Sequence, residues 1–129
     1  MKKLRFFLLF GLSMCIAPTI RAQTAEEMAS NCKEVVQAPV INGQITFKTP
    51  DFETGFCWGA FTSLHQAAYA TGSDDKPVFR ICFPNTASTS EAVKVFLAYL
   101  DKHPEKLHED YFLIAVIANQ AAFPCKSAP

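Results

Sequence analysis

The sequence predicts an all-α fold: a small disulfide-stapled bundle of about four helices, with a short extended segment before the third helix. Two observations predict it. Apolar residues recur at helical spacing in several stretches of the chain, and four of the five cysteines lie beyond an N-terminal leader. A chain of 129 residues is expected to form one domain.

The leader, residues 1–22, has the order of a secretory signal peptide. A basic start precedes an apolar run from Phe6 to Ala17, and Ile20-Arg21-Ala22 is a cleavage site. The run of about twelve residues is shorter than the ~20 that a membrane-spanning helix needs. A retained anchor is the alternative. We expect export, cleavage near Ala22, and a mature domain over residues 23–129 without stable membrane insertion.

Loss of the leader leaves an acidic domain. The chain has 12 basic and 12 acidic residues, and four of the basic ones lie in the leader, so 8 remain against 12 and the net charge is −4. A negative surface argues against nucleic acid and anionic membranes as partners, and it suits a basic protein partner.

A first helix is expected to start at the capping box Thr24-Ala25-Glu26-Glu27 and to end at Pro39. Its apolar face turns Cys32 inward and comprises Ala25, Met28, Ala29, Cys32 and Val36. After it, Asn42-Gly43 between two short apolar runs is a weak hairpin signal.

A second helix is expected from about Phe52 to Ala70, with Cys57 on its buried face. Gly55 and Gly59 each cost ~1 kcal/mol of helix propensity relative to Ala, which predicts that something packs closely against that turn. A further stripe of half-polar side chains is either the rim of the core or a dimer surface: Trp58, Thr62, His65 and Tyr69.

The third helix is expected to follow a polar loop over residues 71–77 and an extended segment over 78–84. A second capping box, Ser88-Thr89-Ser90-Glu91, starts it, and His103-Pro104 stops it.

The last element lies between Pro104 and Pro124. Tyr111 to Ala118 is an unbroken apolar run, and periodicity alone does not separate a buried helix from a buried strand there. Its length and the acidic start at His108-Glu109-Asp110 favour a helix, whose first turn would hold the carboxylates.

Four cysteines in a small exported domain indicate two disulfides. The competing interpretation is a zinc site, but the chain lacks the close CxxC or HxxxH pairs that supply zinc ligands. Three connectivities are open. Cys32 and Cys57 lie on inward faces of consecutive helices, whereas Cys82 precedes the third helix and Cys125 follows the last. This placement favours Cys32–Cys57 and Cys82–Cys125.

The sequence contains no GxSxG, HExxH or phosphate-binding glycine motif. His103, His108 and Glu109 crowd one helix junction, where a metal ion or a proton relay is one interpretation. A helix stop and a first-turn histidine explain the same residues without chemistry. We therefore predict a binding protein, with no catalytic residues, metal site or cofactor.

Four short motifs occur in a fixed order over about residues 30–126, and together they resemble the type VI secretion amidase immunity family, often called the Tai family. The motifs are Phe56-Cys57-Trp58-Gly59, Cys82-Phe83-Pro84, Tyr99-Leu100-Asp101-Lys102-His103-Pro104-Glu105 and Ala122-Phe123-Pro124-Cys125.

The resemblance implies a small periplasmic helical protein, commonly a dimer, that blocks the active site of a peptidoglycan-cleaving amidase delivered by neighbouring cells. The motifs are cysteines, prolines and helix stops, so they carry the scaffold and not the inhibitory contacts. We expect those contacts in the polar loop, at Ser73, Asp74, Asp75 and Lys76. The alternative function is a periplasmic stress chaperone or general binding protein without a toxin partner.

Overall fold

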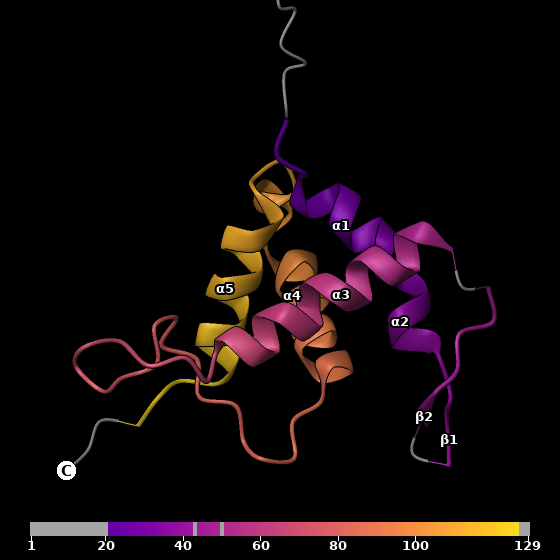
Figure 1. Cartoon of the computed structure of the whole chain (residues 1–129). Helices are drawn as coiled ribbons and strands as arrows, with labels where there is room; N and C mark the ends of the chain where they lie inside the picture. The colour runs from indigo at the N-terminus through magenta and orange to yellow at the C-terminus, as the bar shows by residue number, and fades with distance from the viewer. Residues whose placement is uncertain (1–20, 43, 50, 127–129) are drawn as a thin grey trace, which may run out of the picture.

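The computed structural model describes residues 21–42, 44–49 and 51–126. Most of the expected signal peptide therefore lies outside the described residues. The elements, in chain order, are α1 Ala25–Asn31, α2 Lys33–Gln37, β1 Val40–Ile41, β2 Gln44–Ile45, α3 Phe52–Ala67, α4 Thr89–Lys102, the 3-10 turn η1 Pro104–Lys106 and α5 Tyr111–Ala122. Figure 1 shows α3 crossing in front of α4, with α5 to one side and the α1–α2 pair to the other.

The predicted fold class is correct in its helices and disulfides but wrong in two respects. The described residues contain five α-helices instead of about four, and β1 and β2 form a two-stranded antiparallel sheet. The hairpin that Asn42-Gly43 signals is confirmed, with Val40 paired to Ile45. Asn42 has a φ of 52°, a left-handed conformation that asparagine accepts more readily than most residues.

The extra helix arises because the first predicted helix is broken. Its capping box is confirmed, since Glu27 Oε2 accepts the Thr24 N–H at 2.9 Å and Thr24 Oγ1 accepts the Glu27 N–H at 3.3 Å. The helix is interrupted at Cys32, however, and resumes at Lys33. The interruption shifts the apolar face, so Val35 is buried and Val36 only half-buried.

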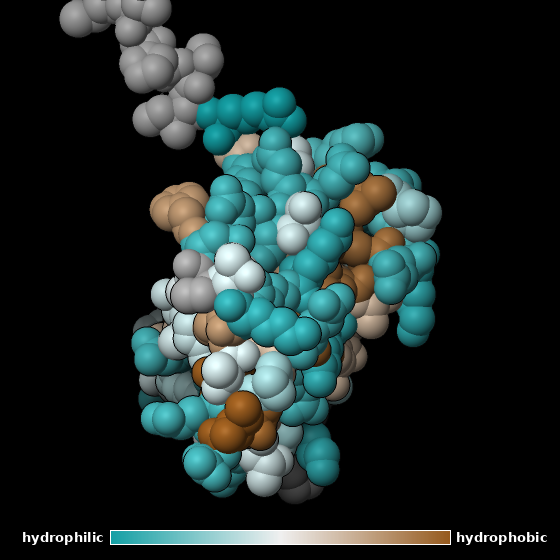
Figure 2. Space-filling view, turned by 90° about the vertical axis from the view of Figure 1, so that its right-hand side faces the viewer, coloured by the Kyte–Doolittle hydropathy of each residue, from teal (hydrophilic) through white to brown (hydrophobic). Residues whose placement is uncertain are grey.

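The β1–β2 hairpin stands away from the helices at one end of the molecule (Figure 1). Val40 and Ile41 on it are 67% and 53% exposed. Figure 2 shows an apolar patch at the lower end of an otherwise largely hydrophilic face. The hairpin therefore contributes little to the core.

α3 begins where Asp51 Oδ1 accepts the Thr54 N–H at 2.8 Å, and it ends at Ala67, three residues before the predicted end. Its inward face packs on α4, where the rings of Phe61 and Phe96 lie 5.3 Å apart. Both side chains are nearly inaccessible to solvent. This contact forms the centre of the hydrophobic core.

The last element is a helix, as predicted. Asp110 Oδ1 accepts the Leu113 N–H at 3.0 Å, so Asp110 caps α5 and the helix begins at Tyr111. His108 and Glu109 therefore precede the first turn, contrary to the prediction. Asn119, which the sequence did not single out, is fully buried and donates from Nδ2 to the carbonyl oxygens of Ala115 and, on α4, Ala92.

The extended segment predicted over residues 78–84 is interrupted in its first part. Val78 and Phe79 form a turn, and Arg80 has a φ of 52°, a left-handed conformation that interrupts a strand. Only Ile81 forms a β-bridge, to Pro124.

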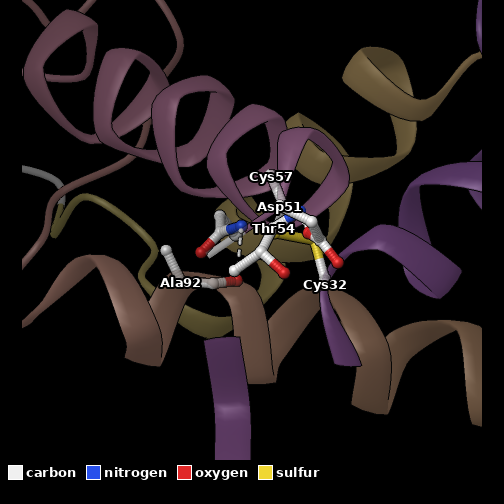
Figure 3. Close-up of a disulfide and its surroundings, with 6 residues drawn as sticks. Cys32, Asp51, Thr54, Cys57 and Ala92 are labelled. Atoms are coloured by element: carbon white, nitrogen blue, oxygen red, sulfur yellow. Dashed lines mark hydrogen bonds between the residues drawn. A yellow bond between two sulfur atoms is a disulfide. The ribbon is translucent and has the colours of Figure 1, made fainter. Parts of the chain in front are cut away.

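The two disulfides are Cys32–Cys57 and Cys82–Cys125, with Cα–Cα distances of 5.3 Å and 4.9 Å. Figure 3 shows the first beneath the N-terminal end of α3, close to Asp51 and Thr54. Both of its cysteines are fully buried, whereas Cys82 is exposed and Cys125 half-buried. One bridge thus lies in the core and the other near the surface.

Removing either bridge should weaken the fold. In the chain-entropy model, closing a loop with a sequence separation of 25 is worth about 3 kcal/mol. We expect Cys32→Ala/Cys57→Ala to lower the free energy of unfolding by at least that amount, measured by urea unfolding. Cys82→Ala/Cys125→Ala should lower the free energy of unfolding by a similar entropic amount. It should not add a loss of core packing, because this bridge lies near the surface. Four free thiols in the wild-type mature protein, in non-reducing denaturant, would contradict both expectations.

The capping box should make stability depend on pH. Because Glu27 accepts the Thr24 N–H, the pKa of its carboxyl lies below the ordinary value of 4.5. Its stabilising contribution is therefore complete above that ordinary value and is lost as the pH falls through the lower pKa of the folded protein. We expect the difference in unfolding free energy between wild type and Glu27→Ala to shrink as the pH falls from about 7 to about 2. Urea unfolding at several pH values measures this, and a difference that stays constant would exclude it.

Candidate functional site

A loop over residues 71–80 projects from the helical body between α3 and α4 (Figure 1); we call it the 71–80 loop. It starts at a β-bridge between Thr71 and Pro77, beside which the Val78 N–H donates to the Ala70 carbonyl at 2.9 Å. At its far end, Gln120 of α5 donates to the Phe79 carbonyl at 2.6 Å. Both ends are thus held by hydrogen bonds, one set local and the other to α5.

The tip of the loop is ordered by its own polar groups. Asp74 Oδ1 accepts the Lys76 N–H at 3.3 Å, and Asp74 Oδ2 pairs with Arg80 Nη2 at 3.1 Å. The Gly72 N–H donates to the Lys76 carbonyl at 2.9 Å. Asp75 has a φ of 56°, as a tight turn at this point requires. The loop therefore has a defined shape before any partner binds.

The sequence-predicted contact residues are all at this tip. Ser73, Asp74, Asp75 and Lys76 are each exposed to solvent. Asp74 and Asp75 are acidic and Lys76 and Arg80 are basic, so both signs of charge lie close together. Such a surface recognises a partner by hydrogen bonds and short-range charge pairing more than by net charge.

A second feature is an apolar groove of about 610 Å³ between α3 and α5; we call it the α3–α5 groove. α3 contributes Phe52, Gly55, Phe56, Gly59, Ala60 and Ser63, and α5 contributes Tyr111 and Phe112. Phe52 is 79% exposed and Phe112 40% exposed. The ring of Phe112 also lies 5.7 Å from that of Phe79, so the base of the 71–80 loop reaches the groove.

The two glycines of α3 face this groove. The sequence predicted a close neighbour at Gly55 and Gly59, but a Cβ at either position would meet no atom within 4 Å. The prediction is wrong because these residues lie on the outer face of α3, opposite Cys57 and Phe61. Among the residues that the structure describes, no packing contact offsets their cost in helix propensity.

The sequence did not identify the groove, although one signal for it was present. Glu53 is the only residue of α3 that carries a full charge at neutral pH, whereas an outward helix face is normally lined with charged and polar residues. A long helix with a single charged residue has more than one apolar face. The residues missed for this reason are Phe52 and Phe56, and with them Phe112, which lines the groove from α5.

The stripe predicted as core rim or dimer surface is partly covered by the chain itself. The Trp58 ring has the Phe47 ring edge-on at 5.9 Å, and the His65 ring lies 4.6 Å from that of Phe83. Thr62 is half-buried, whereas Tyr69 is 55% exposed. A dimer role for these four residues stays a prediction.

The histidines and acids form no metal centre in the described part of the chain. No group of three or more His, Cys, Asp and Glu side chains is arranged to hold an ion there. His103 Nδ1 pairs with Glu105 at 3.1 Å, and His108 Nδ1 lies 4.0 Å from a carboxylate oxygen of Glu26. The titratable residue that lines the α3–α5 groove is Tyr111, and burial raises the pKa of its hydroxyl above the ordinary value. The groove suits apolar contact and not acid–base chemistry.

Residues 24–125, which include the disulfides, the loop and the groove described above, match the model of the Rap1a immunity proteins. The chain belongs to the Rap1a immunity protein family. The match spans both disulfides, the 71–80 loop and the α3–α5 groove, and the Rap1a family is a type VI secretion immunity family. The resemblance noted in the sequence is confirmed at this level.

Neither a curated protein nor a solved structure matches the chain. Among the described residues of this Rap1a family member, no helix is both long and apolar enough to cross a membrane.

The loop should lose its order when Asp74 is removed. Asp74→Ala deletes both the pair with Arg80 and the acceptor for the Lys76 N–H. Because both partners are about half exposed, with side-chain exposures of 56% and 50%, we expect the free energy of unfolding to change by less than about 1 kcal/mol. Trypsin cleavage after Arg80 should become several-fold faster, since local opening is easier. Ser73→Ala is the matched control, and equal cleavage rates in the two variants would refute this account of the loop.

Proposed function

We propose that this protein is a periplasmic immunity protein that binds a type VI secreted peptidoglycan amidase and blocks its active site with the 71–80 loop. Membership of the Rap1a immunity family supports a secreted effector as the partner. The leader supports export to the periplasm, where such an amidase meets peptidoglycan. The amidase as target rests on the motif resemblance in the sequence.

The observation that carries the proposal is the pre-formed, projecting loop. The Asp74–Arg80 pair, the internal hydrogen bonds and the Gln120 contact hold it before binding. A segment that is already ordered loses less conformational entropy on binding, so more of the contact energy appears as affinity. The loop therefore has the property that an inhibitor of an active-site cleft needs.

Charge supports the same partner class. The mature domain has a net charge of −4 if the leader is removed near Ala22, since 8 basic residues then face 12 acidic ones. An acidic protein associates faster with a basic one, and most strongly at low ionic strength. A basic cell-wall hydrolase is a partner of that kind.

The test uses the mature chain, residues 23–129, and the amidase encoded in the neighbouring reading frame. We expect the wild type to bind that amidase and to stop its hydrolysis of purified peptidoglycan. Asp74→Ala/Asp75→Ala should weaken binding by about tenfold or more, the effect expected of contacts near the centre of an interface. Calorimetry and the hydrolysis assay measure the two effects.

A charge-matched control separates loop contact from general electrostatics. Glu26→Ala/Asp101→Ala removes two exposed acidic residues from α1 and from the C-terminal part of α4. This variant should retain affinity at moderate ionic strength. Unchanged affinity in Asp74→Ala/Asp75→Ala would remove the loop from the inhibitory surface, and absence of any binding to the amidase would remove the amidase as target.

A further inference from the structure

The two disulfides differ in their accessibility to solvent. Cys32 and Cys57 are fully buried, whereas Cys82 is exposed and Cys125 half-buried. A thiolate must approach one of the two sulfur atoms to break a disulfide, so a buried bridge reacts only when the protein opens. The Cys82–Cys125 bridge is therefore the one that a reductant can attack in the folded protein.

A positively charged side chain lies close to the accessible bridge. Arg80 and Cys125 line one cavity of about 490 Å³, together with Gln120 and Pro124. Thiol–disulfide exchange has an anionic attacking thiolate and an anionic leaving thiolate, and a nearby cation stabilises both. The Arg80 guanidinium also pairs with Asp74 at 3.1 Å, which reduces the positive potential that it creates in the cavity.

The chain around this bridge has other contacts that hold it in place. Ile81 and Phe83 flank Cys82 and are 1% and 7% exposed. The Phe83 ring lies 4.8 Å from that of Phe123, and the Cys82 N–H donates to the Phe123 carbonyl at 2.9 Å. These contacts do not involve the sulfur atoms. The domain therefore keeps its core and its buried bridge when the exposed bridge is opened.

We propose that the Cys82–Cys125 bridge is a reducible site for dithiols, and that its cleavage loosens the 71–80 loop while the domain stays folded. One thiolate of the dithiol attacks Sγ of the exposed Cys82, the sulfur–sulfur bond breaks, and Cys125 leaves as a thiolate in the cavity that Arg80 lines. The second thiol of the reagent then displaces Cys82 from the mixed disulfide. The dithiol is oxidised to a disulfide with loss of two electrons and two protons, and the protein gains two thiols.

The position of the bridge links its reduction to the loop. Cys82 lies two residues beyond Arg80, the last residue of the 71–80 loop, and the chain after α5 runs beside the base of the loop (Figure 1). Removing one of several restraints on a segment makes its local opening more frequent. The consequence for inhibition rests on the proposed function. A less ordered loop loses more conformational entropy when it binds the effector, so the reduced protein inhibits more weakly.

The first test treats the folded mature chain with dithiothreitol in the absence of denaturant and identifies the free thiols by alkylation and mass spectrometry. Cys82 and Cys125 should be alkylated about tenfold faster or more than Cys32 and Cys57. The partly reduced protein should keep its helical circular dichroism, and trypsin should cleave it after Arg80 several-fold faster. Equal rates for the two bridges, or reduction only when the helical signal is lost, would overturn the proposal.

Two matched variants test the charge of Arg80, since each removes its pair with Asp74. Arg80→Gln also removes the cation, so reduction should become slower, on the order of threefold. Asp74→Asn keeps the cation and frees it from its carboxylate, so reduction should become faster. A looser loop alone would accelerate the reaction in both variants, so opposite directions separate charge from mobility. Faster reduction of Arg80→Gln would refute the role given to this cation.

The choice of reagent distinguishes two sources of the dithiol. Dithiothreitol represents a small dithiol, and purified thioredoxin represents a protein with a Cys-x-x-Cys pair. Faster reduction by thioredoxin at equal thiol concentration would assign the site to protein oxidoreductases, and slower reduction would assign it to small dithiols.

An inhibition assay tests the effect on effector binding. The partly reduced, alkylated wild type and Cys82→Ala/Cys125→Ala should each inhibit the amidase several-fold more weakly than the oxidised wild type. Equal inhibition would remove the effect of the bridge on the effector. Because the reduction assays contain no effector, their failure leaves the proposed immunity function untouched. An oxidised wild type that does not inhibit would count against that function and leave the reducible site standing.

Discussion

The buried Cys32–Cys57 disulfide is the constraint on which the arrangement of the helices depends. Its two Cα atoms lie 5.3 Å apart, which brings the break between α1 and α2 directly against α3. Cys57 is directed inward. Helical geometry therefore directs Phe52 and Gly55, which precede it by five and two positions, and Gly59, which follows it by two, toward the opposite side of α3. The open apolar face of α3 is thus a consequence of where the core disulfide holds the helix.

The surface disulfide has a different consequence. Cys82–Cys125 joins the chain just beyond the 71–80 loop to the chain just beyond α5, and the Ile81–Pro124 bridge lies beside it. Gln120 also donates to the Phe79 carbonyl. The segment that leads from the 71–80 loop back to the helices is therefore held by a covalent bond, a β-bridge and a hydrogen bond. A loop held in this way keeps its shape without a hydrophobic core of its own.

The sequence predicts what depends on local pattern and fails where distant contacts decide. The caps at Thr24 and Ser88 and the burial of Cys57 follow from spacing and are confirmed. The break at Cys32 is not visible in the periodicity, and it falls at a cysteine whose disulfide partner lies 25 residues away. The segment at Arg80 has an alternating pattern, yet among the described residues it forms only the isolated bridge between Ile81 and Pro124, and Gln120 of α5 binds its Phe79 carbonyl. Of the two candidate surfaces, the polar loop was recognisable by composition, whereas the groove needed the orientation of α3.

The two surfaces differ in the chemistry by which they can discriminate. The 71–80 loop offers carboxylates and ordered backbone, which suit hydrogen bonding and charge pairing with a foreign protein. The α3–α5 groove offers aromatic rings and bare helix backbone without a charged side chain, which suit apolar contact and selection by shape. The Phe79–Phe112 contact at 5.7 Å joins the base of the loop to the wall of the groove. A contact that restrains Phe112 would therefore also restrain the base of the loop.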